Sequence, residues 1–208
     1  PNVLLVDAGD QFQGTLFFNV FRADVVTATM NMLDYDAMAV GNHEFDHGPA
    51  ELARFIDGAN FPVIGTNISV SPSNPLSGTL RHSAAINVGG QPIGLIGLTT
   101  PSAASGSSPG PDVTFADPVA SARAGVADLA GRGIDKVVAL THLGYAADLA
   151  LAQSVSGIDV IVGGHSHTFL HTPPDGAAGP YPTVVQAPDG RPVLVVTAGE
   201  WGRYLGEL

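Results

Sequence analysis

Short apolar runs alternate with helix-like apolar stripes along most of the chain. Runs of adjacent apolar residues, typical of buried strands, occupy residues 3–6, 37–40, 61–65, 136–140 and 158–162. Segments with helical apolar spacing or helix-start signals occupy residues 23–33, 49–56, 117–129 and 146–155. The order of these segments predicts an α/β fold in which strands and helices alternate.

The remaining segments predict further β-structure and two loops. Strands are predicted at residues 84–88, 92–98, 183–186 and 193–197 and near Tyr204. The first two flank a Gly-Gly turn and predict a hairpin, whereas residues 69–78 and 102–111 are rich in Ser, Gly and Pro and predict surface loops. This arrangement indicates two sheets packed face to face with helices on the outside.

Polar residues that suit metal binding follow four of the predicted strands. Asp10 follows the first strand, Asn42 the second, and His142 the strand at 136–140. The strand at 158–162 leads into Gly163-Gly164-His165-Ser166-His167. Because open α/β sheets build their sites at the carboxyl ends of strands, these residues predict a metal centre.

The residue types fit a centre that holds two metal ions. Asp10 offers a carboxylate that can bridge two ions, His142 and His165 offer imidazole nitrogen, and Asn42 offers an amide oxygen. This mixed set suits Zn, Mn or Fe. His167 lies on the same side of its loop as His165 and can reach a second ion.

His43 and Asp46 form a candidate acid–base pair. His43 follows Asn42 on an extended backbone, so its side chain points elsewhere and need not bind metal. Asp46, three residues later, can hold the His43 ring and raise its basicity. Such a pair is suited to protonating a leaving group.

Each of these residues also has a purely structural explanation. Taken alone, Asp10 is a turn residue or helix cap, Asn42 a turn residue, and His142 a buried core histidine. The Gly-Gly-His-Ser-His stretch, taken alone, is a polar loop. The metal centre is favoured because four independent strand ends carry suitable residues.

Composition narrows the classes of function. The chain has 208 residues and a formal net charge of −11, with no basic run, which argues against a nucleic-acid polymer as partner. It contains no cysteine, which excludes disulfides and thiolate zinc sites. No apolar run is long enough to span a bilayer, and no signal peptide is recognisable.

The order of the motifs resembles the calcineurin-like metallophosphoesterases. The motifs are Gly9-Asp10, Gly41-Asn42-His43-Glu44, Thr141-His142 and Gly163-Gly164-His165-Ser166-His167. More narrowly, residues 7–15 and 42–46 and the stretch Gly202-Arg203-Tyr204-Leu205-Gly206 look like the catalytic domain of secreted 5′-nucleotidases. The resemblance covers essentially the whole chain.

The resemblance implies a four-layer α/β/β/α sandwich of two mixed sheets. It also implies two divalent metal ions, with Asp10 bridging both, Asn42, His142 and His165 completing one, and His167 facing the other. His43 and Asp46 match the catalytic dyad of the family. The implied reaction is in-line attack of a metal-activated hydroxide on phosphorus, without a phospho-enzyme.

The sequence departs from the family pattern at both ends. The family's first metal motif, an Asp-x-His pair on a preceding strand, is absent before Pro1. The C-terminal domain that supplies the nucleobase clamp in the family is absent after Leu208. We therefore expect residues 1–208 to be a catalytic domain without its first strand, cut from a longer parent chain that carries the C-terminal domain.

The expected function is hydrolysis of nucleoside monophosphates by a secreted or periplasmic parent protein. Within the same family, the alternatives are a 2′,3′-cyclic-nucleotide phosphodiesterase, a nucleotide-sugar hydrolase or a thiosulfate-ester hydrolase. A different class is a non-catalytic fragment that binds a single metal ion. Because the first metal motif is missing, we expect weak or absent activity from the isolated chain.

Overall fold

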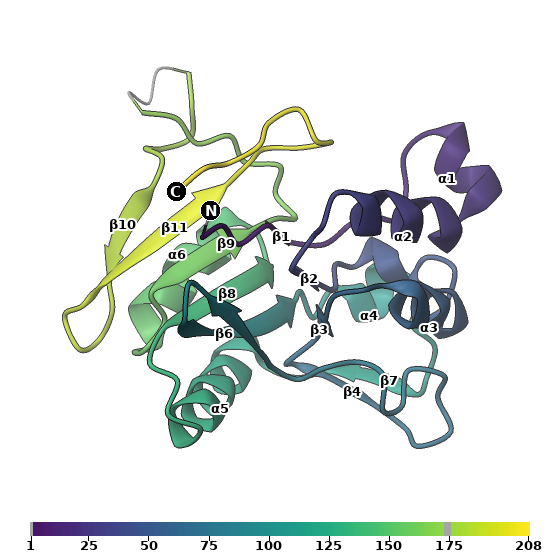
Figure 1. The fold of residues 1–208 in the computed structure, drawn as a ribbon, viewed down its shortest axis with the longest axis horizontal. Helices are drawn as coiled ribbons and strands as arrows, with labels where there is room; N and C mark the ends of the chain where they lie inside the picture. The colour runs from purple at the N-terminus through teal and green to yellow at the C-terminus, as the bar shows by residue number, and fades with distance from the viewer. Residues whose placement is uncertain (1, 173–175) are drawn as a thin grey trace.

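The strands form two principal sheets in the computed structural model, which describes residues 2–172 and 176–208 (Figure 1). The smaller sheet has the order β1 (Val6–Asp7), β2 (Ala37–Ala39) and β3 (Val63–Ile64). The larger sheet has the order β10 (Thr183–Gln186), β11 (Pro192–Thr197), β9 (Val160–Gly163), β8 (Val137–His142), β6 (Gln91–Thr99) and β5 (Ala84–Val88). The larger sheet is mixed, with antiparallel pairs at both edges, whereas both pairings of the smaller sheet are parallel.

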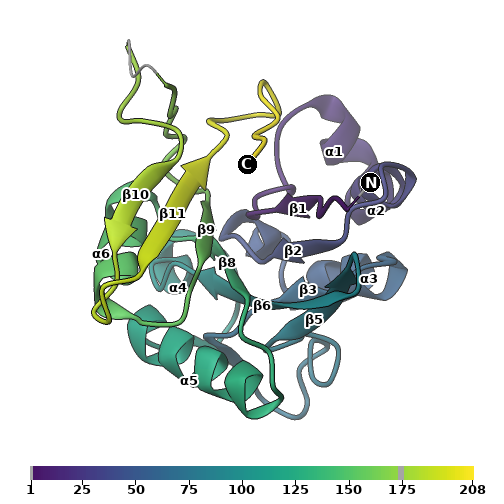
Figure 2. The same ribbon diagram turned by 60° about the vertical axis from the view of Figure 1, so that its left-hand side comes forward.

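Helices cover the outer face of each sheet, as Figures 1 and 2 show. The smaller sheet is covered by α2 (Ala23–Met32) and α3 (Pro49–Gly58), and the larger by α5 (Pro118–Gly131) and α6 (Tyr145–Ser154). The expected α/β/β/α layering is therefore confirmed, but only the larger sheet is mixed as expected, because both pairings of the smaller sheet are parallel. Within the described ranges, no helix combines the length and the apolar character that crossing a membrane requires.

Three apolar clusters hold the layers together, and the alternation of side chains along each strand creates them. On β2, Met38 packs with the helices α2 and α3, while Ala37 and Ala39 point into the contact between the sheets. On β8, Ala139 packs toward α5 and α6, and Leu140 points into that same contact. Successive residues of a strand face opposite sides, so each central strand contributes to two interfaces.

Several segments differ from the sequence prediction. The stretch near Tyr204 is not a strand; its ring instead packs on Phe169, with ring centroids 4.8 Å apart. The predicted loop at residues 69–78 overlaps β4 (Ile68–Val70), which pairs antiparallel with β7 (Val113–Phe115). The predicted loop at residues 102–111 ends just before β7 and contains the short helix α4 (Ala103–Gly106). Helix α1 (Leu16–Phe21) is not predicted by the sequence pattern, and the predicted first strand narrows to Val6–Asp7.

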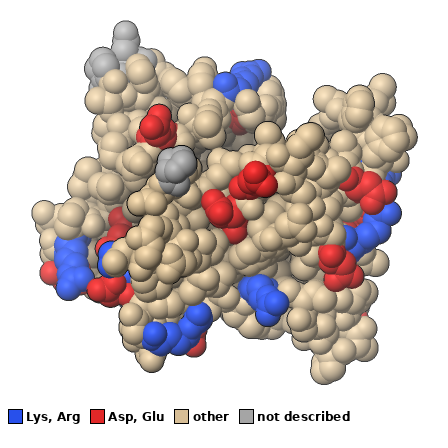
Figure 3. All heavy atoms as spheres, in the orientation of Figure 1, with Lys and Arg blue, Asp and Glu red and all other residues tan. Residues whose placement is uncertain are grey.

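Charged side chains are sparse on the face shown in Figure 3. They lie in small, separate groups among uncharged atoms, with acidic and basic residues often adjacent. Exposed ion pairs of the chain include Arg54–Asp24, 2.9 Å apart, and Arg132–Asp128, 3.2 Å apart. Exposed pairs of this kind contribute little to stability.

Candidate metal centre

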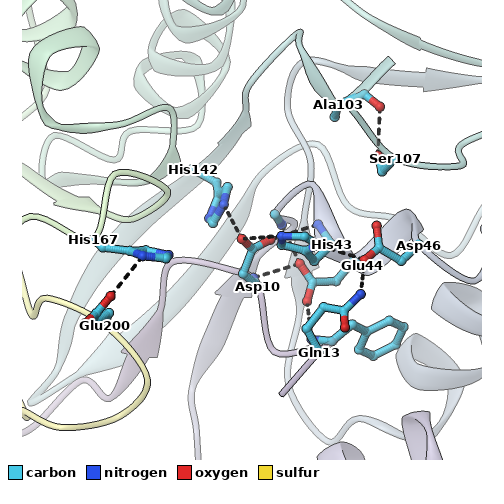
Figure 4. A network of polar contacts seen from close by, with 12 residues as sticks. Asp10, Gln13, His43, Glu44, Asp46, Ala103, Ser107, His142, His167 and Glu200 are labelled. Atoms are coloured by element: carbon cyan, nitrogen blue, oxygen red, sulfur yellow. Dashed lines mark hydrogen bonds and ion pairs between the residues drawn. The ribbon is translucent and has the colours of Figure 1, made fainter. Parts of the chain in front are cut away.

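The carboxyl ends of four strands from two sheets meet at one place. The loops after β1 and β2 carry Asp10 and Asn42, the last residue of β8 is His142, and the loop after β9 carries His165. Figure 4 shows Asp10 and His142 facing one another across the junction of the sheets. The structure therefore brings together residues that lie far apart in the sequence.

Asp10, His142 and His165 form a compact group of potential metal ligands. Each offers one ligand atom, and these atoms all lie within 4.8 Å of one another. Asp10 Oδ2 lies 2.9 Å from His142 Nε2, and the His142 and His165 rings meet edge to face with centroids 5.1 Å apart. One carboxylate and two imidazoles at this spacing suit a transition-metal ion.

One buried polar atom at this group, Oδ1 of Asn42, has no hydrogen-bond partner in the described part of the chain. His142 Nδ1 lies 2.8 Å from the Ala8 carbonyl oxygen, to which it can donate, and this contact turns Nε2 toward Asp10. An unpaired buried acceptor is costly, and coordination of a cation would satisfy the Asn42 oxygen. The residues present therefore fit a metal ion.

The electrostatics of the group also favour a cation. Burial lowers the pKa of His142, but the hydrogen bond and charge of Asp10 outweigh burial and hold that pKa above its usual value. Burial and the charge of His142 lower the pKa of His165, which keeps its imidazole neutral. The neutral His165 ring offers a free lone pair to a metal ion, and the Asp10 charge that raises the pKa of His142 would also attract a cation.

Glu44 holds the loops that carry Asp10 and Asn42, and it is not among the residues predicted for the site. Its fully buried carboxyl group accepts backbone N–H bonds from Gly41 (2.7 Å), Asp10 (2.8 Å) and Phe12 (3.0 Å). Burial and the charge of Asp10 raise the pKa of Glu44 to about 7, against the lowering effect of these bonds. The signal that could have found it is its place in Gly41-Asn42-His43-Glu44, where an acid follows the polar strand end.

The backbone at the site is strained and closely packed. Asp10 (φ 68°), His165 (φ 72°) and His167 (φ 54°) all adopt the left-handed region that non-glycine residues rarely occupy. At Gly41, a Cβ atom would lie 2.3 Å from Asp10 Oδ1, so only glycine fits there. Strain of this kind is typical of functional sites.

His43 and Asp46 lie beside the group and contact each other directly. His43 Nδ1 is 2.7 Å from Asp46 Oδ2, and the Gln13 amide also donates to that oxygen. His43 Nε2 lies 4.0 Å from Asp10 Oδ2, so the ring faces the centre (Figure 4). The expected extended backbone is wrong here, because Asn42 is helical and the residues His43–Phe45 form a short 3-10 helix that turns the ring inward. Partial burial lowers the pKa of His43, but the bond to Asp46 and the nearby carboxylates outweigh it and raise that pKa above its usual value. His43 therefore lies beside the centre with a raised pKa, which suits the donation of a proton.

His167 lies outside the compact group of ligands. Its Nδ1 is 3.0 Å from Glu200 Oε2, and half of its side chain is exposed (Figure 4). The expected role of His167 at a second metal ion stays a prediction. The sequence does not predict the part played by Glu200, because the contact depends on how the chain returns after β11.

A family model, a curated relative and a solved structure all match most or all of this chain. A family model described as calcineurin-like phosphoesterase matches residues 1–169. The chain is 46% identical to a snake venom 5′-nucleotidase of Crotalus adamanteus, over all of this chain and 36% of the relative. A 5′-nucleotidase precursor from Thermus thermophilus, known from a crystal structure, is 51% identical in sequence to this chain. The two structures match with a TM-score of 0.93, over 96% of this chain and 40% of that one.

A second solved structure extends the comparison. The NAD nucleotidase of Haemophilus influenzae is 33% identical, with a TM-score of 0.88 over 94% of this chain and 40% of that one. The chain thus spans between a third and two fifths of the length of these relatives.

Proposed function

The chain belongs to the calcineurin-like phosphoesterase family, and from that premise we propose that it is the catalytic part of a 5′-nucleotidase. Such an enzyme hydrolyses nucleoside monophosphates to nucleosides and phosphate. Identities of 46% and 51% to proteins named 5′-nucleotidases support this substrate class.

One observation carries the proposal. Asp10, His142 and His165 converge within 4.8 Å beside the unpartnered amide oxygen of Asn42. We assign these four residues as ligands of a divalent cation such as Zn or Mn. When bound, the cation supplies Lewis-acid stabilisation of charge on phosphoryl oxygens and acidifies the attacking water.

His43 is the proposed general acid. Water forms the new bond to phosphorus while the bond from phosphorus to the 5′ oxygen breaks, and that oxygen needs a proton as it leaves. The His43 imidazolium, held by Asp46 at 2.7 Å, supplies the proton from Nε2. No covalent intermediate with the protein is required.

We also propose that this catalytic domain acts within a longer parent protein. The short coverage of the relatives, 36% to 40%, supports a further C-terminal domain that binds the nucleoside part of the substrate. His167, with ligands from outside this chain, would complete a second metal site. The likeness to a venom enzyme supports export of the parent from the cytoplasm.

A second candidate is hydrolysis of a phosphate anhydride such as that of NAD. The 33% identity to an NAD nucleotidase supports it, because the same centre can attack phosphorus in either kind of bond. The two candidates differ in the leaving group, so substrate preference separates them.

The test is turnover by the parent-length protein with AMP, 2′,3′-cyclic AMP and NAD as separate substrates. The proposal expects phosphate release from AMP at ~1–10³ s⁻¹, the range of ordinary enzymes. His43→Ala should lower kcat about 100-fold, and the metal content should not change. His82→Ala, a change at an exposed histidine, is the matched control. Turnover of NAD without turnover of AMP would replace the proposal with the second candidate.

A further inference from the structure

Asp148 is a buried acid on α6 that the proposed reaction does not use. It is fully buried, and its Oδ1 accepts a hydrogen bond of 2.6 Å from the Thr141 hydroxyl group. Its Oδ2 has no hydrogen-bond partner among the described residues. A buried carboxyl group with one unpaired oxygen costs stability, so a role other than stability would explain its presence.

The Asp148 carboxyl group lies between the ends of β8 and β9. Thr141 and Gly163 are partners in the register of these strands. A Cβ atom on Gly163 would lie only 2.2 Å from Asp148 Oδ2, so the carboxyl group rests directly against the backbone of Gly163. Asp148 therefore contacts both members of this strand pair.

Each member of the pair is followed closely by a proposed ligand. His142 comes directly after Thr141, and His165 comes two residues after Gly163. The Gly164 N–H also donates to the Thr141 carbonyl oxygen at 2.8 Å, which joins the two strand ends. Any shift of Thr141 relative to Gly163 would change the distance between the two imidazoles.

Helix α6 contacts the same turn at a second point. The Tyr145 N–H, in the first turn of α6, donates to Ser166 Oγ at 3.0 Å. A hydroxyl group from another segment thus satisfies an N–H group that the helix itself leaves unpaired. Ser166 lies between His165 and His167, so α6 is attached to the turn on both sides of His165.

We propose that Asp148 is a positioning residue for the metal centre, which fixes the separation of His142 and His165 by holding Thr141 and Gly163. The inference rests on the ligand roles proposed above for these two histidines. A positioning role predicts a change in metal affinity, which a purely structural role would not produce once folding is accounted for.

The test measures Zn²⁺ affinity of the 208-residue chain by competition with a chelator. Asp148→Ala should weaken Zn²⁺ binding about 10-fold or more, the effect typical of residues that orient ligands. Asp148→Asn keeps the shape and an acceptor for the Thr141 hydroxyl group, so its affinity should stay within about threefold of the wild type. Circular dichroism confirms that each variant is folded.

A matched control separates positioning from general destabilisation. Asp117 caps α5, the other helix on this face of the sheet, by accepting the Ala120 N–H at 2.7 Å. Asp117→Ala should lower the melting temperature without changing Zn²⁺ affinity. If Asp148→Ala does not fold, Thr141→Val removes the same hydrogen bond with little change in shape and should weaken binding in the same direction.

The outcomes distinguish this inference from the proposed function. Unchanged Zn²⁺ affinity in folded Asp148→Ala or Thr141→Val would overturn the positioning role alone, and so would equal losses in the Ala and Asn variants. A wild-type chain that binds no Zn²⁺ would overturn the inference together with the ligand assignment. Turnover of AMP by the parent-length wild type tests the proposed function independently.

Discussion

Asp10 joins the two sheets at the candidate site, because its carboxylate contacts groups carried by both. Its Oδ1 accepts the His43 N–H at 2.9 Å from the smaller sheet's side, and its Oδ2 lies 2.9 Å from His142 on the larger sheet. Burial raises the pKa of Asp10, but the hydrogen bond and charge of His142 outweigh burial and lower it. Asp10 therefore stays ionised and provides the negative charge that a bound cation needs.

His165 should be required for metal binding. Its imidazole lies within 4.8 Å of the other ligand atoms and is kept neutral, so it is available to coordinate. We expect His165→Ala to lower Zn²⁺ affinity about 10-fold or more, measured by chelator competition. His171→Ala, outside the group, is the control. Equal affinity in both variants would assign His165 a structural role.

Glu44→Gln should destabilise the fold. The amide nitrogen of glutamine cannot accept a hydrogen bond, so at least one of the Gly41, Asp10 and Phe12 N–H groups would lose its partner. Leaving a buried donor unpaired costs about 1–3 kcal/mol of unfolding free energy. Urea unfolding measures this, with the same change at exposed Glu207 as control. A loss equal to that of Glu207→Gln would contradict the assigned role.

At the residue scale, the sequence predicts side chains at strand ends better than side chains that support them. Asp10, Asn42 and His142 follow apolar runs, and sheet geometry alone brings such positions together. Glu44, Asp148 and Glu200 act through contacts with residues distant in the sequence or buried under another element. No local pattern distinguishes Asp148 and Glu200 from ordinary surface acids, and Glu44 is marked only by its place after Gly41-Asn42-His43.

At the element scale, the predictions succeed where an element is long or strongly periodic. Helices α2, α3, α5 and α6 all lie within two residues of their predicted ends. The short helix α1 was missed because Leu16, Phe17 and Val20 on it are exposed, so no buried stripe marks it. The stretch near Tyr204 carries aromatic residues typical of a strand, yet its ring packs on Phe169 without strand pairing.

Asp148, on helix α6, should make the unfolding free energy of the chain depend on pH. Burial raises the pKa of Asp148 to about 7, against the lowering effects of the Thr141 hydroxyl group and the charge of His142. The unfolded chain releases this proton at about pH 4 and the folded chain at about pH 7. Between these values the folded state holds more protons, so the contribution of Asp148 to the unfolding free energy falls as pH rises.

Asp148→Asn should remove that dependence. The unfolding free energy of the variant minus that of the wild type should rise by roughly 1–3 kcal/mol as the pH increases from about 5 to about 7. Urea unfolding in the presence of EDTA measures the difference for the metal-free chain. The contributions of Asp7 and Glu44, whose pKa values burial also raises, cancel in the comparison. A difference that stays constant with pH would contradict the prediction.

At the scale of the whole molecule, the close contact of the two sheets creates the site. At Gly97, a Cβ atom would lie 2.3 Å from the Ile64 carbonyl oxygen, so this glycine lets β6 approach β3 closely. The small residues Ala37 and Ala39 fill the same contact. Alternation of strands and helices predicts two layered sheets, but it does not predict how closely they approach. That distance determines whether Asp10 and His142 can share an ion.

The 208-residue chain should bind one divalent ion tightly. Asp10, Asn42, His142 and His165 are the four ligands proposed for one ion, whereas His167 is paired with Glu200 at 3.0 Å. Elemental analysis after dialysis against trace Zn²⁺ and Mn²⁺ should therefore give about one ion per chain. His167→Ala should leave this value unchanged, and His165→Ala should lower it. Two tightly bound ions in the wild type, reduced to one in His167→Ala, would instead mean that His167 leaves Glu200 to build a second site within this chain.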